Sequence, residues 1–226
     1  MTSDDPIRQR LVLVTTSLGD DGADEALRRA LSGGDVASVL IDPAGREPGA
    51  FQDFAERLVP IAQEAGAAAI VIDDTRCAGR VKADGIHLSG GRLSVLGETI
   101  EAHASRMIVG AGGFKTRHDA LEAGELMPDY MFFGRLGQDT EEEPHPKTLA
   151  MAEWWAAMVE LPCIALGAHG LESLSVLAET EAEFIALSAA IFDPAGGEAE
   201  AVGKANDMLE ERYRHLKELV KAKAEA

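Results

Sequence analysis

Polar residues and glycines recur directly after the short apolar runs of this 226-residue sequence. Residues of these types bind anions through cationic side chains or backbone N–H groups, bind hard cations through carboxylates, or transfer protons. They are Thr15, Thr16, Asp42, Asp73, Asp74, His87, Ser89, Gly110, Gly112, Gly113, Arg135, His169 and Ser188, and Ala189 and Ala190 join them for their backbone N–H groups. If the apolar runs are neighbouring parallel strands, all of these residues meet at one edge of the sheet.

The adjacent carboxylates Asp73 and Asp74 suit a magnesium site, because Mg²⁺ usually takes one or two carboxylates together with substrate phosphates. Asp74 also directly precedes a stretch of helical composition that begins at Thr75. There its carboxylate can accept hydrogen bonds from the free N–H groups of the first helical turn. We therefore predict that Asp74 caps this helix, and that Asp73 either faces the pocket as a metal ligand or faces away from it.

His87 ends an apolar run within ADGIHLS. It is a candidate proton donor, although a lone histidine is more typically a wall residue whose ring bonds a neighbouring carbonyl group. The glycines at 110, 112 and 113 would let backbone N–H groups approach a phosphate closely, but a plain tight turn needs them too. Arg135 follows another apolar run and is the second catalytic candidate.

The elements that must position these residues follow from the alternation of apolar runs with stretches of helical periodicity. One such stretch carries Phe51, Phe54, Leu58 and Ile61 on a single helical face. The predicted strands are 11–16, 36–41, 68–72, 85–88, 107–109, 130–133, 163–166 and 184–187. Eight strands alternating with helices in a chain of this length predict a single (β/α)8 TIM barrel over residues 1–226.

A doubly wound open sheet is the main alternative fold. It is weakened in its nucleotide-binding form, because no G-x-G-x-x-G or G-x-x-x-x-G-K-[ST] stands at a strand-to-helix turn. In a barrel, the loops after the seventh and eighth strands commonly bind phosphate through backbone N–H groups. Those loops contain Gly167 and Ala168 in one case and Ser188, Ala189 and Ala190 in the other.

Two further segments stand out. Residues 137–146 form a polar, acidic loop after the sixth predicted strand, which we expect to be solvated. Residues 198–226 read as a C-terminal helix, in which Leu209, Tyr213, Leu216 and Val220 form an apolar stripe. The stripe could bind a partner, but a final helix that packs on the barrel needs the same stripe, and we favour that interpretation.

The overall charge excludes several classes of partner. The chain has 21 basic and 39 acidic residues, a net charge of −18, so both nucleic acid and an anionic membrane surface should repel it. No apolar run approaches the roughly 20 residues that cross a bilayer. The polar start lacks the pattern of a secretory or transit signal, which predicts a cytoplasmic protein. Cys77 and Cys163 lie among apolar residues and are expected to be small buried hydrophobes.

One segment is fairly specific to a known family. Residues 73–89, DDTRCAGRVKADGIHLS, resemble the segment N-D-[DRH]-x-x-x-A-x-x-x-x-A-D-G-[VI]-H-L-G of thiamine-phosphate synthase and its relative, the thiazole tautomerase, beginning at the first Asp of that pattern. Shorter matches follow in the same order, namely LVLVTT at 11–16, ALSGG at 30–34, DYMFFG at 129–134, IALG at 164–167 and ALSAAI at 186–191. The resemblance covers most of the chain, from 11 to 191.

The resemblance implies a barrel that joins a pyrimidine diphosphate to a thiazole phosphate with Mg²⁺ and releases diphosphate. Carried onto this sequence, the family's first metal ligand falls on Asp73, but its second falls on Arg92. The thiazole phosphate would be held by the backbone of Gly167, Ala168, Ala189 and Ala190. The family's diphosphate-binding T-x-T-K corresponds to Asp139-Thr-Glu-Glu142, so Arg92, Lys115 or Arg135 would have to bind that anion instead.

Other positions also depart from the family pattern. The serine after the fifth strand falls on Gly112, and the acid/base histidine of the tautomerase falls on Phe114. We therefore expect a thiamine-phosphate synthase-like barrel that binds a phosphorylated small molecule, with most catalytic motifs changed. The alternatives are a catalytically inactive phosphate-ligand-binding or regulatory barrel, and an enzyme of different specificity. The group's tendency to self-associate makes a homo-oligomer a further expectation.

Overall fold

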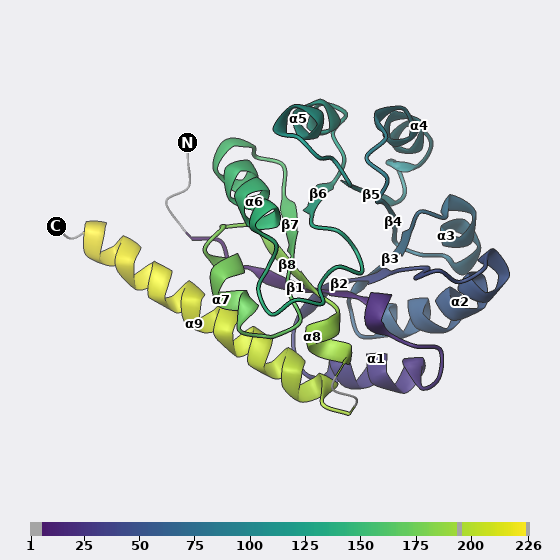
Figure 1. Cartoon of the computed structure of the whole chain (residues 1–226), viewed down its shortest axis with the longest axis horizontal. Helices are drawn as coiled ribbons and strands as arrows, with labels where there is room; N and C mark the ends of the chain where they lie inside the picture. The colour runs from purple at the N-terminus through teal and green to yellow at the C-terminus, as the bar shows by residue number, and fades with distance from the viewer. Residues whose placement is uncertain (1–5, 194–195, 225–226) are drawn as a thin grey trace.

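The computed structural model describes residues 6–193 and 196–224. Eight parallel strands form a closed barrel in the order β1 to β8, each paired with its neighbours in sequence and β8 paired with β1 (Figure 1). The strands are β1 (Arg10–Val14), β2 (Val36–Ile41), β3 (Ala68–Ile72), β4 (Gly85–Leu88), β5 (Ile108–Gly112), β6 (Tyr130–Phe133), β7 (Cys163–Leu166) and β8 (Phe184–Leu187). The predicted (β/α)8 barrel is confirmed.

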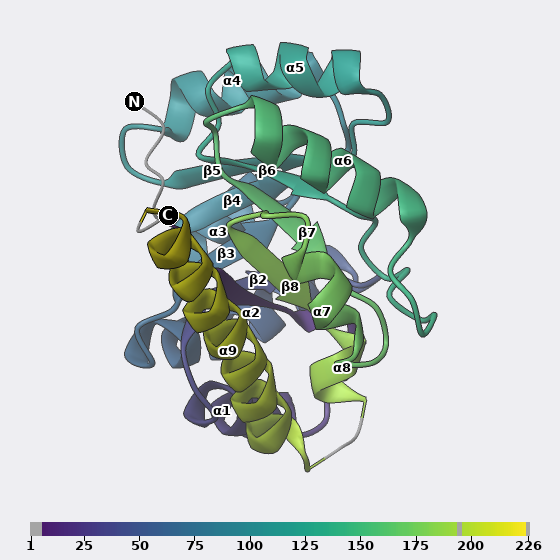
Figure 2. The same cartoon turned by 90° about the vertical axis from the view of Figure 1, so that its left-hand side faces the viewer.

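Helices connect the strands and cover the outside of the barrel (Figures 1 and 2). They are the 3-10 turn η1 (Thr15–Ser17), α1 (Ala23–Ser32), α2 (Pro48–Glu64), α3 (Thr75–Val81), α4 (Leu93–His103), α5 (Arg117–Glu125), α6 (Pro146–Met158), α7 (Ser173–Ala178), α8 (Ala189–Phe192) and α9 (Glu198–Ala224). Pro146 begins α6, as expected of a residue whose missing N–H would be unpaired there in any case. Within the described residues, no helix is both long and apolar enough to cross a bilayer.

Six of the eight predicted strands have the observed bounds, and the other two were wrong at their ends. The first strand ends at Val14, because Thr15 and Thr16 turn into η1. The fifth strand continues to Gly112, where the prediction ended it at Val109 and assigned the glycines to a loop. Gly110 and Gly112 therefore belong to the wall of the barrel, where neighbouring side chains pack against them.

Two hydrophobic clusters make up the core. One fills the space between the sheet and the helices and includes Trp155 and Phe51. The other fills the barrel interior with side chains from the strands, among them Val12, Ile70 and Phe132. Cys77 and Cys163 are buried in the first cluster as free thiols, and burial raises the pKa of the Cys77 thiol to about 11. Their predicted role as small hydrophobes is confirmed.

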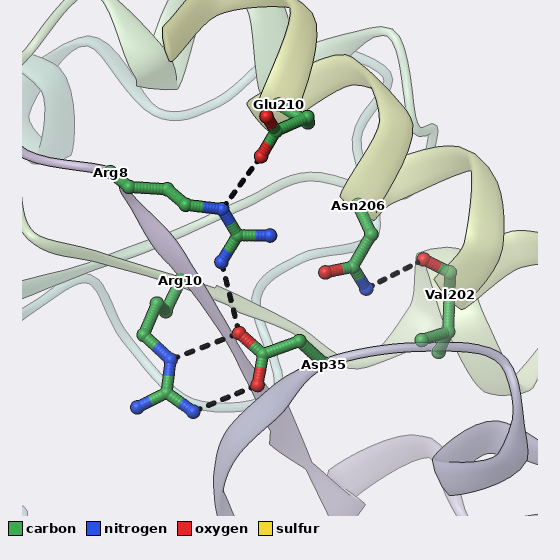
Figure 3. A network of polar contacts seen from close by, with 6 residues as sticks. All are labelled: Arg8, Arg10, Asp35, Val202, Asn206 and Glu210. Atoms are coloured by element: carbon green, nitrogen blue, oxygen red, sulfur yellow. Dashed lines mark hydrogen bonds and ion pairs between the residues drawn. The ribbon is translucent and has the colours of Figure 1, made fainter.

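Ion pairs fix α9 to the barrel at two places. Near its start, both carboxylate oxygens of Glu198 accept hydrogen bonds from the Arg29 guanidinium, at 2.8 and 2.9 Å. Further along, Arg8 donates to Glu210 at 2.8 Å and to Asp35 at 3.0 Å, and Arg10 also binds Asp35 (Figure 3). These contacts tie the chain before β1, the start of β2 and the middle of α9 together.

Candidate anion-binding site

A pocket of about 640 Å³ opens at the carboxyl ends of β4 to β7. His87 and Phe132 line it from the strands, while the loops after β5 and β6 contribute cationic side chains. Lys115 comes from the loop after β5, Arg135 from the loop after β6, and Lys147 from the first turn of α6. Active sites of barrels of this class lie at this face.

Lys115, Arg135 and Lys147 are exposed, and none of their side chains makes a hydrogen bond or ion pair within the described part of the chain. Many other basic residues are paired, for example Arg29 with Glu198 and Arg46 with Asp20. Glu143 is the one carboxylate among the described residues that line the pocket. A wall with three unpaired cations, on a chain of net charge −18, is suited to an anionic ligand.

His87 is fully buried at the edge of this pocket. Its Nδ1 lies 3.1 Å from the Tyr130 hydroxyl oxygen, and its Nε2 has no hydrogen-bond partner. Burial lowers the pKa of His87 to about 4, so the ring is neutral at pH 7. If Tyr130 donates to Nδ1, the only unpaired group is Nε2–H; the other tautomer leaves the Tyr130 hydroxyl hydrogen unpaired as well. The first tautomer is therefore favoured, and it presents an N–H donor.

Two glycines of β5 make room for this pair. A Cβ on Gly110 would lie 2.0 Å from the Tyr130 ring, and a Cβ on Gly112 would lie 3.2 Å from His87 Nε2. The glycines thus accommodate aromatic side chains within the strand, in addition to any role in approaching a ligand. The wall interpretation of His87 is correct in its burial, but its partner is a tyrosine hydroxyl and not a carbonyl group.

Asp73 and Asp74 have separate roles. The Asp74 carboxylate accepts from the N–H groups of Arg76 and Cys77, at 3.0 and 2.8 Å, so the predicted helix cap is confirmed. Both carboxylate oxygens of Asp73 bind Ser89, one through its N–H at 2.8 Å and one through its hydroxyl. Asp73 is not among the residues that line the pocket.

This arrangement does not fit a magnesium site built on Asp73. Each Asp73 oxygen accepts one hydrogen bond from Ser89 and keeps a lone pair, but the residue at the family's second ligand position, Arg92, is an exposed cation before α4. Across residues 6–193 and 196–224, no group of three or more His, Cys, Asp or Glu side chains is placed to hold a metal ion. We therefore derive no chemical step through Mg²⁺.

Of the four backbone N–H groups predicted to bind phosphate beyond β7 and β8, three have partners within the chain, and that of Ala190 has none among the described residues. The N–H of Ala189 donates to the Asp139 carboxylate at 2.8 Å, and that of Gly167 donates to the Ala186 carbonyl at 2.8 Å. The N–H of Ala168 lies 3.3 Å from the Ser173 hydroxyl. Asp139 is only 3% exposed, which corrects the expectation that the whole acidic loop is solvated; Glu141, Glu142 and Glu143 are exposed as expected.

The remaining predicted residues near β8, β1 and β2 also bind one another. The Thr16 hydroxyl donates to the Asp42 carboxylate, and the Thr15 hydroxyl accepts from the Asp42 N–H at 2.9 Å. The Ser188 hydroxyl accepts from the Ser17 N–H at 3.0 Å. His169 lies outside the main pocket, with Nε2 3.1 Å from the Asp193 carboxylate.

The pocket thus brings together part of the predicted set. The predicted residues that line it are His87, Ser89, Gly113, Lys115, Arg135 and Gly167; those outside it are Asp73, Arg92, Gly112, Ala168, Ser188, Ala189 and Ala190. Sequence reasoning missed Lys147, His145 and Tyr130. The first two stand beside Pro146 at the start of α6, a signal that could have placed them next to Arg135, but Tyr130 looks like any aromatic residue of a buried strand.

The fold and this site define a (β/α)8 barrel with a cation-lined pocket at the carboxyl ends of its strands. Comparison with known proteins identifies its relatives. Residues 11–191 match the family described as thiamine monophosphate synthase, and the chain belongs to that family.

Individual relatives agree with this assignment. The thiamine-phosphate synthase of Hyphomonas neptunium is 32% identical over 211 residues, which cover 90% of this chain and 95% of the relative. That of Erythrobacter litoralis is 33% identical over 187 residues, covering 80% and 86%. Among solved structures, the thiamine phosphate pyrophosphorylase of Pyrococcus furiosus superposes with a TM-score of 0.72 at 22% identity, covering 90% of this chain and 96% of that one.

Proposed function

We propose that this barrel binds a phosphorylated small molecule of the kind handled by thiamine-phosphate synthases, with the phosphate between Lys115, Arg135 and Lys147. The observation that carries the proposal is the presence of three cations without a hydrogen-bond or ion-pair partner around one pocket of about 640 Å³. Such a volume accommodates a small-molecule ligand. Charge-assisted hydrogen bonds from lysine and arginine to phosphate are among the stronger polar contacts in proteins.

Below the cations, the pocket offers groups for an uncharged ring. Phe132 provides an aromatic surface, and its ring centroid lies 5.2 Å from that of His87. His87 lies behind this surface, fully buried and neutral, with its Nε2 unpaired. Thiazole phosphate combines an aromatic ring with a phosphate, and so matches both parts of the pocket.

Binding is tested by thermal unfolding in the presence of thiazole phosphate, thiamine phosphate or inorganic phosphate. A ligand that binds only the native state stabilises it, by about 2.7 kcal/mol when the ligand concentration is a hundred times Kd. The Tm rises as a consequence. We expect a shift with at least one phosphate ester. No shift with any of the three, in buffer free of phosphate, would remove the basis of the proposal.

A second candidate function is the synthase reaction itself, favoured by the 32% and 33% identical relatives, which are thiamine-phosphate synthases. In that reaction the bond between the pyrimidine methylene carbon and the diphosphate oxygen breaks. The thiazole nitrogen forms a new bond to that carbon, and diphosphate leaves. Lys115 and Arg135 would stabilise the negative charge that develops on the leaving diphosphate.

Purified protein with both substrates, with and without Mg²⁺ and with a chelator, separates the two candidates. Thiamine phosphate above the no-enzyme control supports the synthase function, and loss of product with the chelator would show that the reaction needs a metal despite the donor set around Asp73. Absence of product at high protein concentration, together with a thermal shift by thiazole phosphate, supports a binding barrel without synthase activity.

A further inference from the structure

His145 stands where the acidic loop after β6 meets α6. It is exposed and lines the pocket together with Lys147. As the residue directly before α6 it is the N-cap, and its Nδ1 accepts a hydrogen bond from the Lys147 N–H at 3.1 Å. Pro146, between them, has no N–H to satisfy, and its ring fixes φ for the first helical turn. The start of a 13-residue helix therefore holds His145 in the wall of the pocket.

The helix cap determines which ring nitrogen of His145 carries the proton. Because Nδ1 accepts a hydrogen bond, it carries no hydrogen of its own, and the proton lies on Nε2. A ring protonated on both nitrogens would set its own N–H against the Lys147 N–H. The positive end of the α6 dipole would also disfavour the charge of such a ring. With Nδ1 turned to the helix backbone, the uncharged ring presents an Nε2–H donor on its other side.

The chain supplies no acceptor for this donor. Within residues 6–193 and 196–224, the Lys147 N–H is the one hydrogen-bond partner of the His145 ring. Glu143, the carboxylate of the pocket, makes no ion pair with His145 or Lys147. His169, another exposed histidine, differs in this respect, because its Nε2 lies 3.1 Å from the Asp193 carboxylate. The acceptor for His145 Nε2–H therefore comes from the solvent or from a ligand.

The neighbours of His145 indicate the acceptor atom of that ligand. Lys147 and Arg135 line the same pocket without a partner among the described residues, and they attract an anion to this wall. Phosphate oxygens are strong hydrogen-bond acceptors. We propose that His145 is a ligand-binding residue, which donates its Nε2–H to a phosphate oxygen of the bound ligand beside Lys147. The inference rests on the proposed function, because it concerns the phosphate in the same pocket.

This contact adds something that the three cations do not supply. A lysine ammonium is a point charge on a flexible stem, and it attracts an anion from many directions. The His145 ring is held by the cap, so its N–H can bond an acceptor in one direction only. We therefore expect Lys147 to contribute mainly attraction, and His145 to orient the phosphate.

The variant His145→Asn separates the helix cap from the donor. The asparagine Oδ1 can accept the Lys147 N–H in place of Nδ1, but the shorter side chain has no atom in the place of Nε2. His145→Asn should therefore keep its Tm and raise the Kd for thiazole phosphate about tenfold or more, measured by calorimetric titration. His145→Ala also removes the cap, so it should raise Kd and lower Tm by about 2–4 °C.

Two controls show whether the contact is local and whether it is made to phosphate. His215→Asn, the same substitution at an exposed histidine of α9 outside the pocket, should leave Kd unchanged. His145→Asn should weaken the binding of inorganic phosphate by a factor similar to that for thiazole phosphate. Weaker binding of thiazole phosphate alone would place His145 against the ring of the ligand and overturn the inference.

The position of the proton is tested by nuclear magnetic resonance. A long-range proton–nitrogen correlation spectrum distinguishes the two ring nitrogens, and the His145 signals are those that His145→Asn lacks. In the protein without ligand we expect the proton on Nε2 and none on Nδ1. The Nε2 signal should move when thiazole phosphate is added. A proton on Nδ1, or an Nε2 signal that stays in place at saturation, would overturn the inference.

Failure of this inference can be distinguished from failure of the proposed function. If wild type binds none of the phosphate ligands, the proposed function fails and the inference fails with it. If wild type binds thiazole phosphate, and Lys115→Ala with Arg135→Ala weakens that binding while His145→Asn does not, only the inference fails.

Discussion

The two halves of the barrel rim use their polar residues differently. In the closed half, at the ends of β8, β1 and β2, Thr16 binds Asp42, Ser17 binds Ser188, and Ala189 binds Asp139. In the open half, at the ends of β4 to β7, the cations of the pocket have no partner within the described residues and His87 Nε2 is unpaired. Both halves have the polar side chains that barrel active sites use, but only the open half leaves them free to bind another molecule.

The comparison shows why residue type and strand position did not suffice to identify the site. A buried polar group that finds a partner within the chain contributes to stability, about 0.5–1.5 kcal/mol for a typical hydrogen bond. A group without one contributes to binding when a ligand supplies the partner. Substitutions in the open half should therefore change ligand binding, and those in the closed half should change stability alone.

The strongest test removes two cations of the open half. Lys115→Ala with Arg135→Ala should raise the Kd for a phosphate ester by about a hundredfold or more, since each hydrogen bond to a charged group contributes about 1.5–3 kcal/mol and tenfold in Kd is about 1.4 kcal/mol. Calorimetric titration with thiazole phosphate measures it. Arg76→Ala removes a cation elsewhere and should leave Kd unchanged. Similar Kd values for the double variant and wild type would place the phosphate outside this pocket.

The second test concerns the floor of the open half. Gly110→Ala puts a Cβ 2.0 Å from the Tyr130 ring, and we expect a loss of about 3 kcal/mol or more in the free energy of unfolding, measured with urea. Gly79→Ala is the matched control: nothing lies within 4 Å of its added Cβ in α3, and alanine should stabilise that helix by about 0.5–1 kcal/mol. If Gly110→Ala is as stable as wild type, the Tyr130 ring does not depend on the space beside this glycine.

This position also shows how far the sequence could be interpreted. The strand and helix pattern predicted the fold, because apolar runs and helical periodicity are local signals. Gly110 and Gly112 were assigned to a loop, because the side chains that require glycine there lie on other strands. They are the ring of Tyr130 on the next strand and the ring of His87 on the strand before. Asp139 looked solvated, because its partner Ala189 lies 50 residues further along the chain. Positions next to a strand end were identified, whereas the partners that distinguish the two halves of the rim depend on tertiary contacts.

A pH test examines the unpaired histidine. The pKa of His87 lies at about 4 in the native state and near 6.5 in the unfolded chain, because burial disfavours the charged ring. As pH falls below 6.5, His87 binds a proton in the unfolded chain but not in the native state. The free energy of unfolding therefore falls with pH, down to about pH 4. Between about pH 7.5 and about pH 5, His87 should account for about 2 kcal/mol of lost stability.

Urea unfolding of wild type and His87→Gln at the two pH values measures this contribution. Glutamine does not titrate, so the His87→Gln variant should lose less stability between the two pH values than wild type does. The difference should equal the contribution of His87. The effect of pH on the other charged groups is common to both proteins and cancels in the difference. The same pH dependence in both would show that the ring is protonated in the native state, with a partner for Nε2.

The smallest effect concerns the closed half. Asp139→Ala removes the acceptor of the Ala189 N–H, and we expect a loss of about 1–2 kcal/mol in the free energy of unfolding. Asp139→Asn should keep most of the stability that Asp139→Ala loses, since the asparagine side-chain oxygen can accept the same hydrogen bond. Glu142→Ala, on the exposed part of the same loop, should have no effect.

Ligand binding by these variants separates the two positions at which a phosphate could lie. If the phosphate binds in the open half, Asp139→Ala lowers stability but leaves the Kd for thiazole phosphate within about twofold, a change of under about 0.5 kcal/mol in binding free energy. If the phosphate instead binds the backbone after β8, Asp139 competes with it, and removing the carboxylate should tighten binding by far more than that. The second result would reverse the assignment of the two halves, because the pairing of Asp139 with Ala189 would then hold a ligand site closed.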